Sequence, residues 1–254
     1  VVGVIKWTSL KEKILNEAIE IKNDFLFNKV SYYAHIAVFS LFTTIFWRIF
    51  YRTIIWKKDG MYVGLTNNYG DLPLHLAYIT SFVWGNNIPP QDPSFAGEKL
   101  VYPFLADFLS AVFLKLGLDF RDMLFIPGLL LTVAFYCILY YFTYRLTKRR
   151  FAAIISVFIF FFTGGFGFYY FFQDLSHTSG SFWSFLTHLP RDYTKIEPLN
   201  YYWITPLTCL NVPQRALLFG FPITMLIFTL LYTGIEHKKW REFLFAGVLA
   251  GVLP

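Results

Sequence analysis

Charged side chains are scarce in this sequence. Of its 254 residues, 15% are Asp, Glu, Lys or Arg, whereas soluble domains have about a quarter. Hydrophobic residues make up 56% and aromatic residues 22%. This excludes an intrinsically disordered chain, because disorder goes with few aromatic residues and high charge. The composition also disfavours a single soluble domain and predicts an integral membrane protein that crosses the bilayer several times.

Cysteines and short catalytic motifs are also few. The two cysteines, Cys137 in an apolar run and Cys209 in a polar loop, predict neither a disulfide nor a metal knuckle. No phosphate-binding P-loop, no G-x-S-x-G and no C-x-x-C occurs. The net charge of +6 is typical of a membrane protein with basic cytoplasmic loops and does not indicate nucleic-acid binding. The chain starts without Met and stops at Pro254 inside an apolar run, so we expect a fragment of a longer chain.

Long apolar runs define the expected spans. A span requires about 20 apolar residues, and the runs that qualify are 31–50, 123–146, 151–172 and 216–234, with a fifth that begins at 243 and is cut off at 254. Residues 11–28 instead place apolar residues at helical spacing between Lys and Glu, which predicts an amphipathic helix on the membrane surface. We therefore expect a cytoplasmic amphipathic segment, 1–30, and a transmembrane domain, 31–254. The predicted fold class is an all-α polytopic transmembrane helix bundle.

Basic residues set the expected orientation. Positive side chains collect in the short loops on the cytoplasmic side, and here they collect between the second and third spans and between the fourth and fifth: Arg145, Lys148, Arg149, Arg150, Lys238, Lys239 and Arg241. Residues 51–122 and 173–215 are then external loops. Residues 101–118 leave two alternatives open. They form either a short, polar span or a helix in the membrane interface, and length and polarity favour the interface.

Two short helices are expected within the first external loop. Residues 71–84 have a helical apolar pattern, with Gly70 and Asp71 as an N-terminal cap and Asn-Asn-Ile-Pro-Pro at 86–90 as a stop. The second helix covers 102–116. These would be two juxtamembrane helices on the outer face.

Two carboxylates are the candidate catalytic residues. Asp71 is followed four residues later by His75, so both share one helix face and could act as a base or hold a cation. Asp174, just after the third span, is expected on the same side of the membrane and could share acid–base work or a divalent cation with Asp71. Alternatively, Asp71 only caps its helix, and Asp174 is only a solvated residue at the end of a helix.

Cationic and aromatic side chains are candidates for substrate binding. Lys99 and Arg215 could bind a phosphate at headgroup level, although Arg215 could equally snorkel to lipid headgroups. The aromatic residues of 173–214 suit a sugar face or an interfacial belt. Asp107 and Lys115, on the second short helix, are expected to face water.

Several of these segments together resemble the GT-C superfamily of membrane glycosyltransferases, in the protein O-mannosyltransferase and aminoarabinose transferase branch. The matching residues lie within about 31–175 and are Gly70-Asp71 after the first span, Glu98 to Pro103 entering the second short helix, Tyr144 to Ala153 at the basic turn, and Asp174 after the third span. The resemblance implies a GT-C-like fold and transfer of a sugar from a polyprenyl-phosphate donor to a protein or glycolipid acceptor outside the cytoplasm.

The resemblance also implies roles for particular residues. Asp71 would be the general base, Asp174 would support it, and Arg215 or Lys99 would hold the donor phosphate, with His75 and Tyr102 also at the substrate. The resemblance establishes no cofactor, and binding of a divalent cation by Asp71 and Asp174 stays an open possibility. The expected location is the plasma membrane of a prokaryote or the endoplasmic reticulum.

Two other functions stay open. A multi-pass transporter or flippase usually needs charged residues at the centres of its spans, which are missing here, although Gly164-Gly165-Phe166-Gly167 could mark a broken helix. The more ordinary role of these glycines is close helix packing. A noncatalytic membrane scaffold subunit is the third possibility.

Overall fold

The computed structural model describes residues 29–65, 68–95 and 97–253. The amphipathic helix predicted over residues 11–28 lies outside the described residues. The chain divides into two compact units, Val1–Ile45 and Phe46–Pro254, and each is described by itself. Most described residues are helical, and the strands form only two short hairpins.

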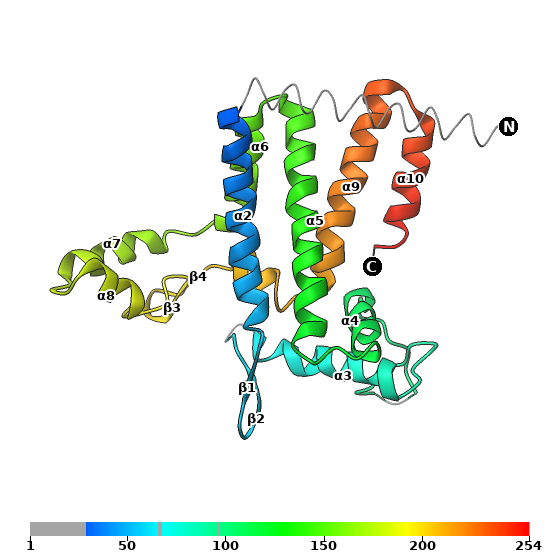
Figure 1. The fold of residues 1–254 in the computed structure, drawn as a ribbon, viewed down its shortest axis with the longest axis horizontal. Helices are drawn as coiled ribbons and strands as arrows, with labels where there is room; N and C mark the ends of the chain where they lie inside the picture. The colour runs from blue at the N-terminus through cyan, green and yellow to red at the C-terminus, as the bar shows by residue number, and fades with distance from the viewer. Residues whose placement is uncertain (1–28, 66–67, 96, 254) are drawn as a thin grey trace. The chain divides into compact units, whose positions relative to one another are not determined.

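Three helices of the described residues are long and apolar enough to cross a membrane: the Tyr32–Tyr51 part of α2 (Lys29–Tyr51), α5 (Asp122–Thr147) and α9 (Ala216–His237). Each covers an apolar run that the sequence marked as a span. In the second unit, α5 packs against α6 (Arg150–Phe162) and α9, and α9 packs against α10 (Trp240–Ala250) (Figure 1).

Two basic turns lie at one end of this bundle. Arg145, near the end of α5, is bonded to Glu236, near the end of α9, and Lys148 Nζ lies 3.8 Å from the same carboxylate. The turns that the sequence predicts to share one side of the membrane are thus held together by ion pairs.

The opposite end of the bundle carries two short helices, α3 (Asp71–Trp84) and α4 (Leu105–Lys115), which pack on each other (Figure 1). They follow a hairpin of β1 (Ile54–Lys57) and β2 (Gly60–Val63), which pair antiparallel with Ile54 opposite Val63. A shared apolar core joins the hairpin, both helices and the start of α5: Ile54, Leu72, Ile79, Val83, Ala111, Met123 and Leu124. At about 1.5 Å per residue, the 11 residues of α4 are far too few to cross about 30 Å of hydrocarbon.

The third apolar run departs from the prediction of one continuous helix over 151–172. Helix α6 ends at Phe162 and α7 (Gly167–His177) starts after a short break, with a bend of 76° between them. The glycines of the break allow close contact with a distant loop. A Cβ on Gly165 would lie 1.8 Å from Tyr201 Oη, and one on Gly167 would lie 1.8 Å from Tyr193 O. The glycines therefore mark a broken helix rather than close packing between helices.

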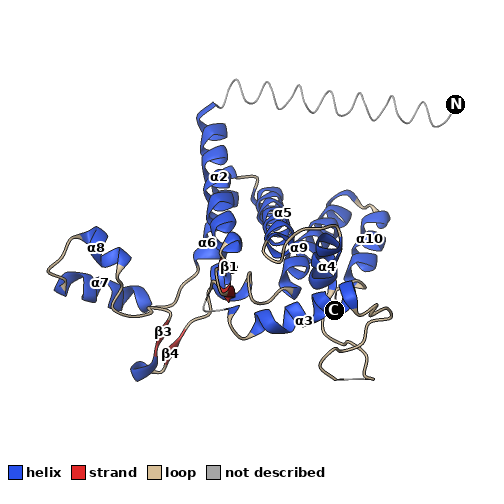
Figure 2. Ribbon diagram, turned by 60° about the horizontal axis from the view of Figure 1, so that its bottom comes forward, coloured by secondary structure: helices blue, strands red, loops and turns tan. Residues whose placement is uncertain are grey.

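The remaining elements follow α7: α8 (Phe182–Thr187), β3 (Lys195–Ile196), η2 (Glu197–Leu199), β4 (Tyr201–Tyr202) and the π-helical turn η3 (Pro206–Leu210). Strands β3 and β4 form an antiparallel hairpin. Helices α7 and α8 lie side by side (Figure 2).

Candidate functional site

A buried charged cluster joins α3, α4 and the start of α9. Asp107 is 0% exposed, and its carboxylate accepts hydrogen bonds from Arg215 Nε at 2.6 Å and from His75 Nδ1 at 2.8 Å. Arg215 Nη2 also donates to the Ala106 carbonyl at 3.1 Å and to Ser110 Oγ at 2.5 Å. We call His75, Asp107, Ser110 and Arg215 the buried cluster.

The imidazole of His75 bonds two oxygen atoms from different parts of the chain. Nδ1 faces the Asp107 carboxylate, and Nε2 faces the Pro213 carbonyl at 2.9 Å. His75 therefore connects α3 both to α4 and to the segment just before α9.

Local sequence explains how these side chains meet. Ala106, Ser110 and Ala111 are small and buried on α4, which allows Arg215 to reach between the helices. His75 is buried on the face of α3 that also carries Leu72 and Ile79. Removing one partner from a buried ion pair typically costs about 3–5 kcal/mol, so the buried cluster fixes α3, α4 and α9 relative to one another.

Asp71 lies one helical turn before His75, as the first residue of α3. It is half-buried, and its Oδ2 accepts a hydrogen bond from Gln214 Nε2 at 3.1 Å. Among the hydrogen bonds of the described residues, this neutral amide is the partner of Asp71, whereas Asp107 and Asp174 are each bonded to an Arg. Asp71 therefore lies at the edge of the buried cluster and, among the hydrogen bonds of the described residues, has a neutral amide as its partner.

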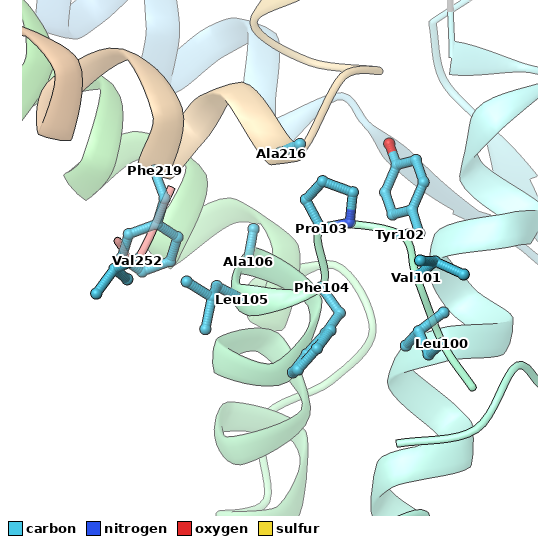
Figure 3. A pocket seen from close by; sticks show the side chains of 10 residues that line it. All are labelled: Leu100, Val101, Tyr102, Pro103, Phe104, Leu105, Ala106, Ala216, Phe219 and Val252. Atoms are coloured by element: carbon cyan, nitrogen blue, oxygen red, sulfur yellow. The ribbon is translucent and has the colours of Figure 1, made fainter. Parts of the chain in front are cut away.

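Tyr102 connects this region to a cavity. Its ring lies 5.8 Å from that of His75 and 5.6 Å from that of Tyr78. Burial, together with the carboxylates of Asp107 and Asp71, raises the pKa of the Tyr102 phenol. The same side chain lines a largely apolar cavity of about 280 Å³ between residues 100–106 and the start of α9, closed on one side by Phe219 and Val252 (Figure 3).

Two cationic side chains lie away from the buried cluster. Lys99 is exposed and belongs to a β-bridge with Gln91. Lys115 Nζ donates to the Val83 carbonyl at 3.3 Å and is exposed, as expected from the sequence. The expectation that Asp107 faces water is wrong, because Asp107 points into the contact between α4 and α9.

Asp174 belongs to a separate group of side chains. It accepts two hydrogen bonds from Arg191, at 2.7 and 2.6 Å, and one from Tyr193 Oη at 2.9 Å. No hydrogen bond of the described residues connects it with Asp71, and in the described part of the chain no three His, Cys, Asp or Glu side chains are grouped as a metal site. A joint catalytic or metal-binding role for Asp71 and Asp174 stays a prediction.

Comparisons with known proteins leave the family open. No protein-family model matches the chain, and neither curated proteins nor solved structures give a significant match.

The sequence named four residues of this region, Asp71, His75, Tyr102 and Arg215, but did not place Asp107 or Gln214 among them. For Asp107 a signal was available. It lies next to Ala106 and precedes Ser110 and Ala111, so it shares its helix with small residues of the kind that let another segment approach closely. Gln214 carries no such signal, because its contact with Asp71 depends on how α9 meets α3.

Proposed function

We propose that this chain is the membrane-embedded part of a glycosyltransferase with a GT-C-like fold. It would move a sugar from a polyprenyl-phosphate donor to a protein or glycolipid acceptor on the extracytoplasmic side. The observation that carries the proposal is the half-buried carboxylate of Asp71, which is bonded to a neutral amide at the end of the bundle opposite the basic turns. Because basic loops of membrane proteins lie on the cytoplasmic side, the end that carries Asp71 would lie outside the cytoplasm.

The proposed reaction uses Asp71 as the general base. Its carboxylate takes the proton of the acceptor hydroxyl, and the acceptor oxygen forms a bond to the anomeric carbon of the sugar. The bond from that carbon to the donor phosphate oxygen breaks, and polyprenyl phosphate leaves with the electron pair. Gln214 orients Asp71 by its hydrogen bond of 3.1 Å.

The buried cluster supports this chemistry by position. Because His75 and Arg215 use buried nitrogens to bond protein atoms, we assign them to the framework rather than to direct contact with the donor. Through Arg215 the cluster holds α4 against the start of α9, next to Gln214 and its hydrogen bond to Asp71. Tyr102, which contacts His75 and lines the apolar cavity, lies between the cluster and the cavity.

The broken helix is the one observation that favours a transporter. Half-helices in transporters leave backbone groups free for ions. Here the break is filled by the protein, since Gly167 N donates to Tyr201 Oη at 2.9 Å and Trp203 Nε1 donates to the Thr163 carbonyl at 3.3 Å. The glycosyltransferase therefore remains the better proposal.

The test measures release of polyprenyl phosphate from a panel of polyprenyl-phosphate sugars by the full-length protein in lipid. We expect Asp71→Asn to lower turnover by about 100-fold or more, as loss of a general base does. Asp119→Asn, an exposed carboxylate on the same rim, is the matched control and should keep wild-type turnover. Asp174→Asn decides whether the second carboxylate participates.

Full activity of Asp71→Asn would remove Asp71 from the mechanism. If the wild-type protein consumes none of the donors, the transfer reaction itself is refuted, and the scaffold alternative gains.

A further inference from the structure

Residues 167–205, here called the lateral arm, fold onto themselves beside the helix bundle. Phe171 of α7 packs against Phe185 of α8 and against Tyr193, with ring centroids 5.3 and 5.4 Å apart. Asp174 bonds Arg191 and Tyr193 and so ties the end of α7 to the segment after α8. The lateral arm is therefore a built unit, with its own small core and its own ion pair.

The lateral arm exposes several large aromatic side chains. On α7, Phe168, Tyr169 and Phe172 occupy positions that share a helix face, and Phe172 is 61% exposed. On α8, Phe182 and Trp183 are exposed, Trp183 by 74%. Exposed groups of large apolar side chains mark surfaces that bind something apolar.

Continuity with α6 indicates which apolar partner this surface meets. Helix α6 runs from the basic turn and has outward apolar residues that are exposed along its length: Phe151, Ile155, Ile159 and Phe162. In the proposed membrane location these residues face lipid tails. The bend of 76° after α6 then directs α7 along the plane of the membrane, the orientation of amphipathic helices that lie in the interface.

Charge and residue type agree with an interface of neutral lipid. Aromatic residues, Trp and Tyr above all, concentrate where headgroups meet acyl chains. The charged residues of the lateral arm are two basic and three acidic: Arg191, Lys195, Asp174, Asp192 and Glu197. The net charge of −1 gives no attraction to anionic lipid, so the contact must be apolar.

We infer that the lateral arm lies in the extracytoplasmic interface of the bilayer, with Phe168, Phe172 and Trp183 inserted among lipids. This inference rests on the membrane location in the proposed function and not on glycosyl transfer. The arm would hold the break between α6 and α7 at the membrane surface.

The test is the depth of nitroxide labels on the full-length protein in phosphatidylcholine bilayers, in a background without native cysteines. Labels at Phe172→Cys and Trp183→Cys report on the aromatic surface. Glu197→Cys, an exposed carboxylate of the same arm, is the matched water-facing control, and Ile155→Cys on α6 reports whether the protein is in the bilayer. Accessibility to oxygen, which concentrates in lipid, is compared with accessibility to a water-soluble nickel chelate.

We expect a ratio of oxygen to nickel accessibility that is several-fold higher at positions 172 and 183 than at 197, and unchanged when anionic lipid is added. Nickel accessibility equal to that at position 197 would overturn the inference, because the arm would then stand in water. Low accessibility to both reagents would also overturn it, because protein would then cover the surface. If the label at position 155 is accessible to oxygen and either of these results is found, only the inference about the lateral arm is refuted. If the label at position 155 is instead accessible to the nickel chelate, the membrane location itself is refuted. Each variant is compared with wild type by gel filtration to establish that it folds.

Discussion

Replacing Asp107 by Asn tests whether the buried cluster holds α3 and α4 in place against α9. The substitution keeps the shape of the side chain but removes the one negative charge between His75 and Arg215. An Asn oxygen can still accept one hydrogen bond, but its amide nitrogen can only donate. The variant therefore leaves the buried Arg215 guanidinium without the carboxylate that pairs with it.

The size of the effect follows from burial. Asp107 is fully buried, and both of its hydrogen bonds, at 2.6 and 2.8 Å, are charge-assisted. Removing one partner of a buried ion pair lowers the free energy of unfolding by about 3–5 kcal/mol, because the other charge is left uncompensated in a medium of low dielectric constant. This is a large share of the roughly 5–15 kcal/mol by which folded domains are stable. Replacing both charges, in Asp107→Leu with Arg215→Met, should recover part of the loss.

Chemical unfolding of the purified protein in detergent micelles measures these free energies. Asp119→Asn is the matched control, since Asp119 is 45% exposed and lies 3.8 Å from Arg121. Its carboxylate accepts from the backbone N–H of Asp122 at 2.7 Å, a role that Asn fills equally well, so its cost should stay under about 1 kcal/mol. Equal stability of Asp107→Asn and Asp119→Asn would refute the reasoning, because it would mean that the cluster is hydrated or compensated elsewhere.

Two further predictions concern the lateral arm. Gly165→Ala should destabilise the arm by about 1–3 kcal/mol, because its Cβ would lie 1.8 Å from Tyr201 Oη. Faster limited proteolysis after α6 would show this loss of stability. The control is Gly164→Ala, whose Cβ would have its nearest atom at 3.8 Å, and this variant should be cleaved at the wild-type rate. Burial and the hydrogen bond to Asp174 raise the pKa of Tyr193 to about 12, so its stabilising contribution should be complete below about pH 10 and lost as the pH rises through about 12. The ultraviolet titration of wild type minus that of Tyr193→Phe measures this, and a difference curve centred near pH 10 would contradict it.

Local pattern predicted the helices whose limits depend on nearby residues. The expected helix over residues 71–84 has the bounds of α3, and the Asn and Pro residues of 86–90 follow its end closely. The predicted cap is wrong, because α3 starts without a side-chain capping hydrogen bond and Asp71 bonds Gln214 instead. The third run was harder, because an apolar sequence alone does not distinguish a continuous helix from a broken one. The break depends on Tyr201 and Tyr193 reaching back to the glycines, and those contacts come from a distant part of the chain.

The three acidic residues Asp71, Asp107 and Asp174 show why the candidate site was only partly predictable. Each lies on a short helix with apolar neighbours, and the sequence favoured Asp71 and Asp174 as catalytic residues while it placed Asp107 in water. Their partners separate them: Asp107 is neutralised by His75 and Arg215, and Asp174 by Arg191, while Asp71 is bonded to a neutral amide. An arginine partner lowers the pKa of the Asp174 carboxyl and makes it a poor base. The role that we propose for Asp71 depends on this difference in partners, which the sequence does not show, because the residues that bond each acid lie far from it along the chain.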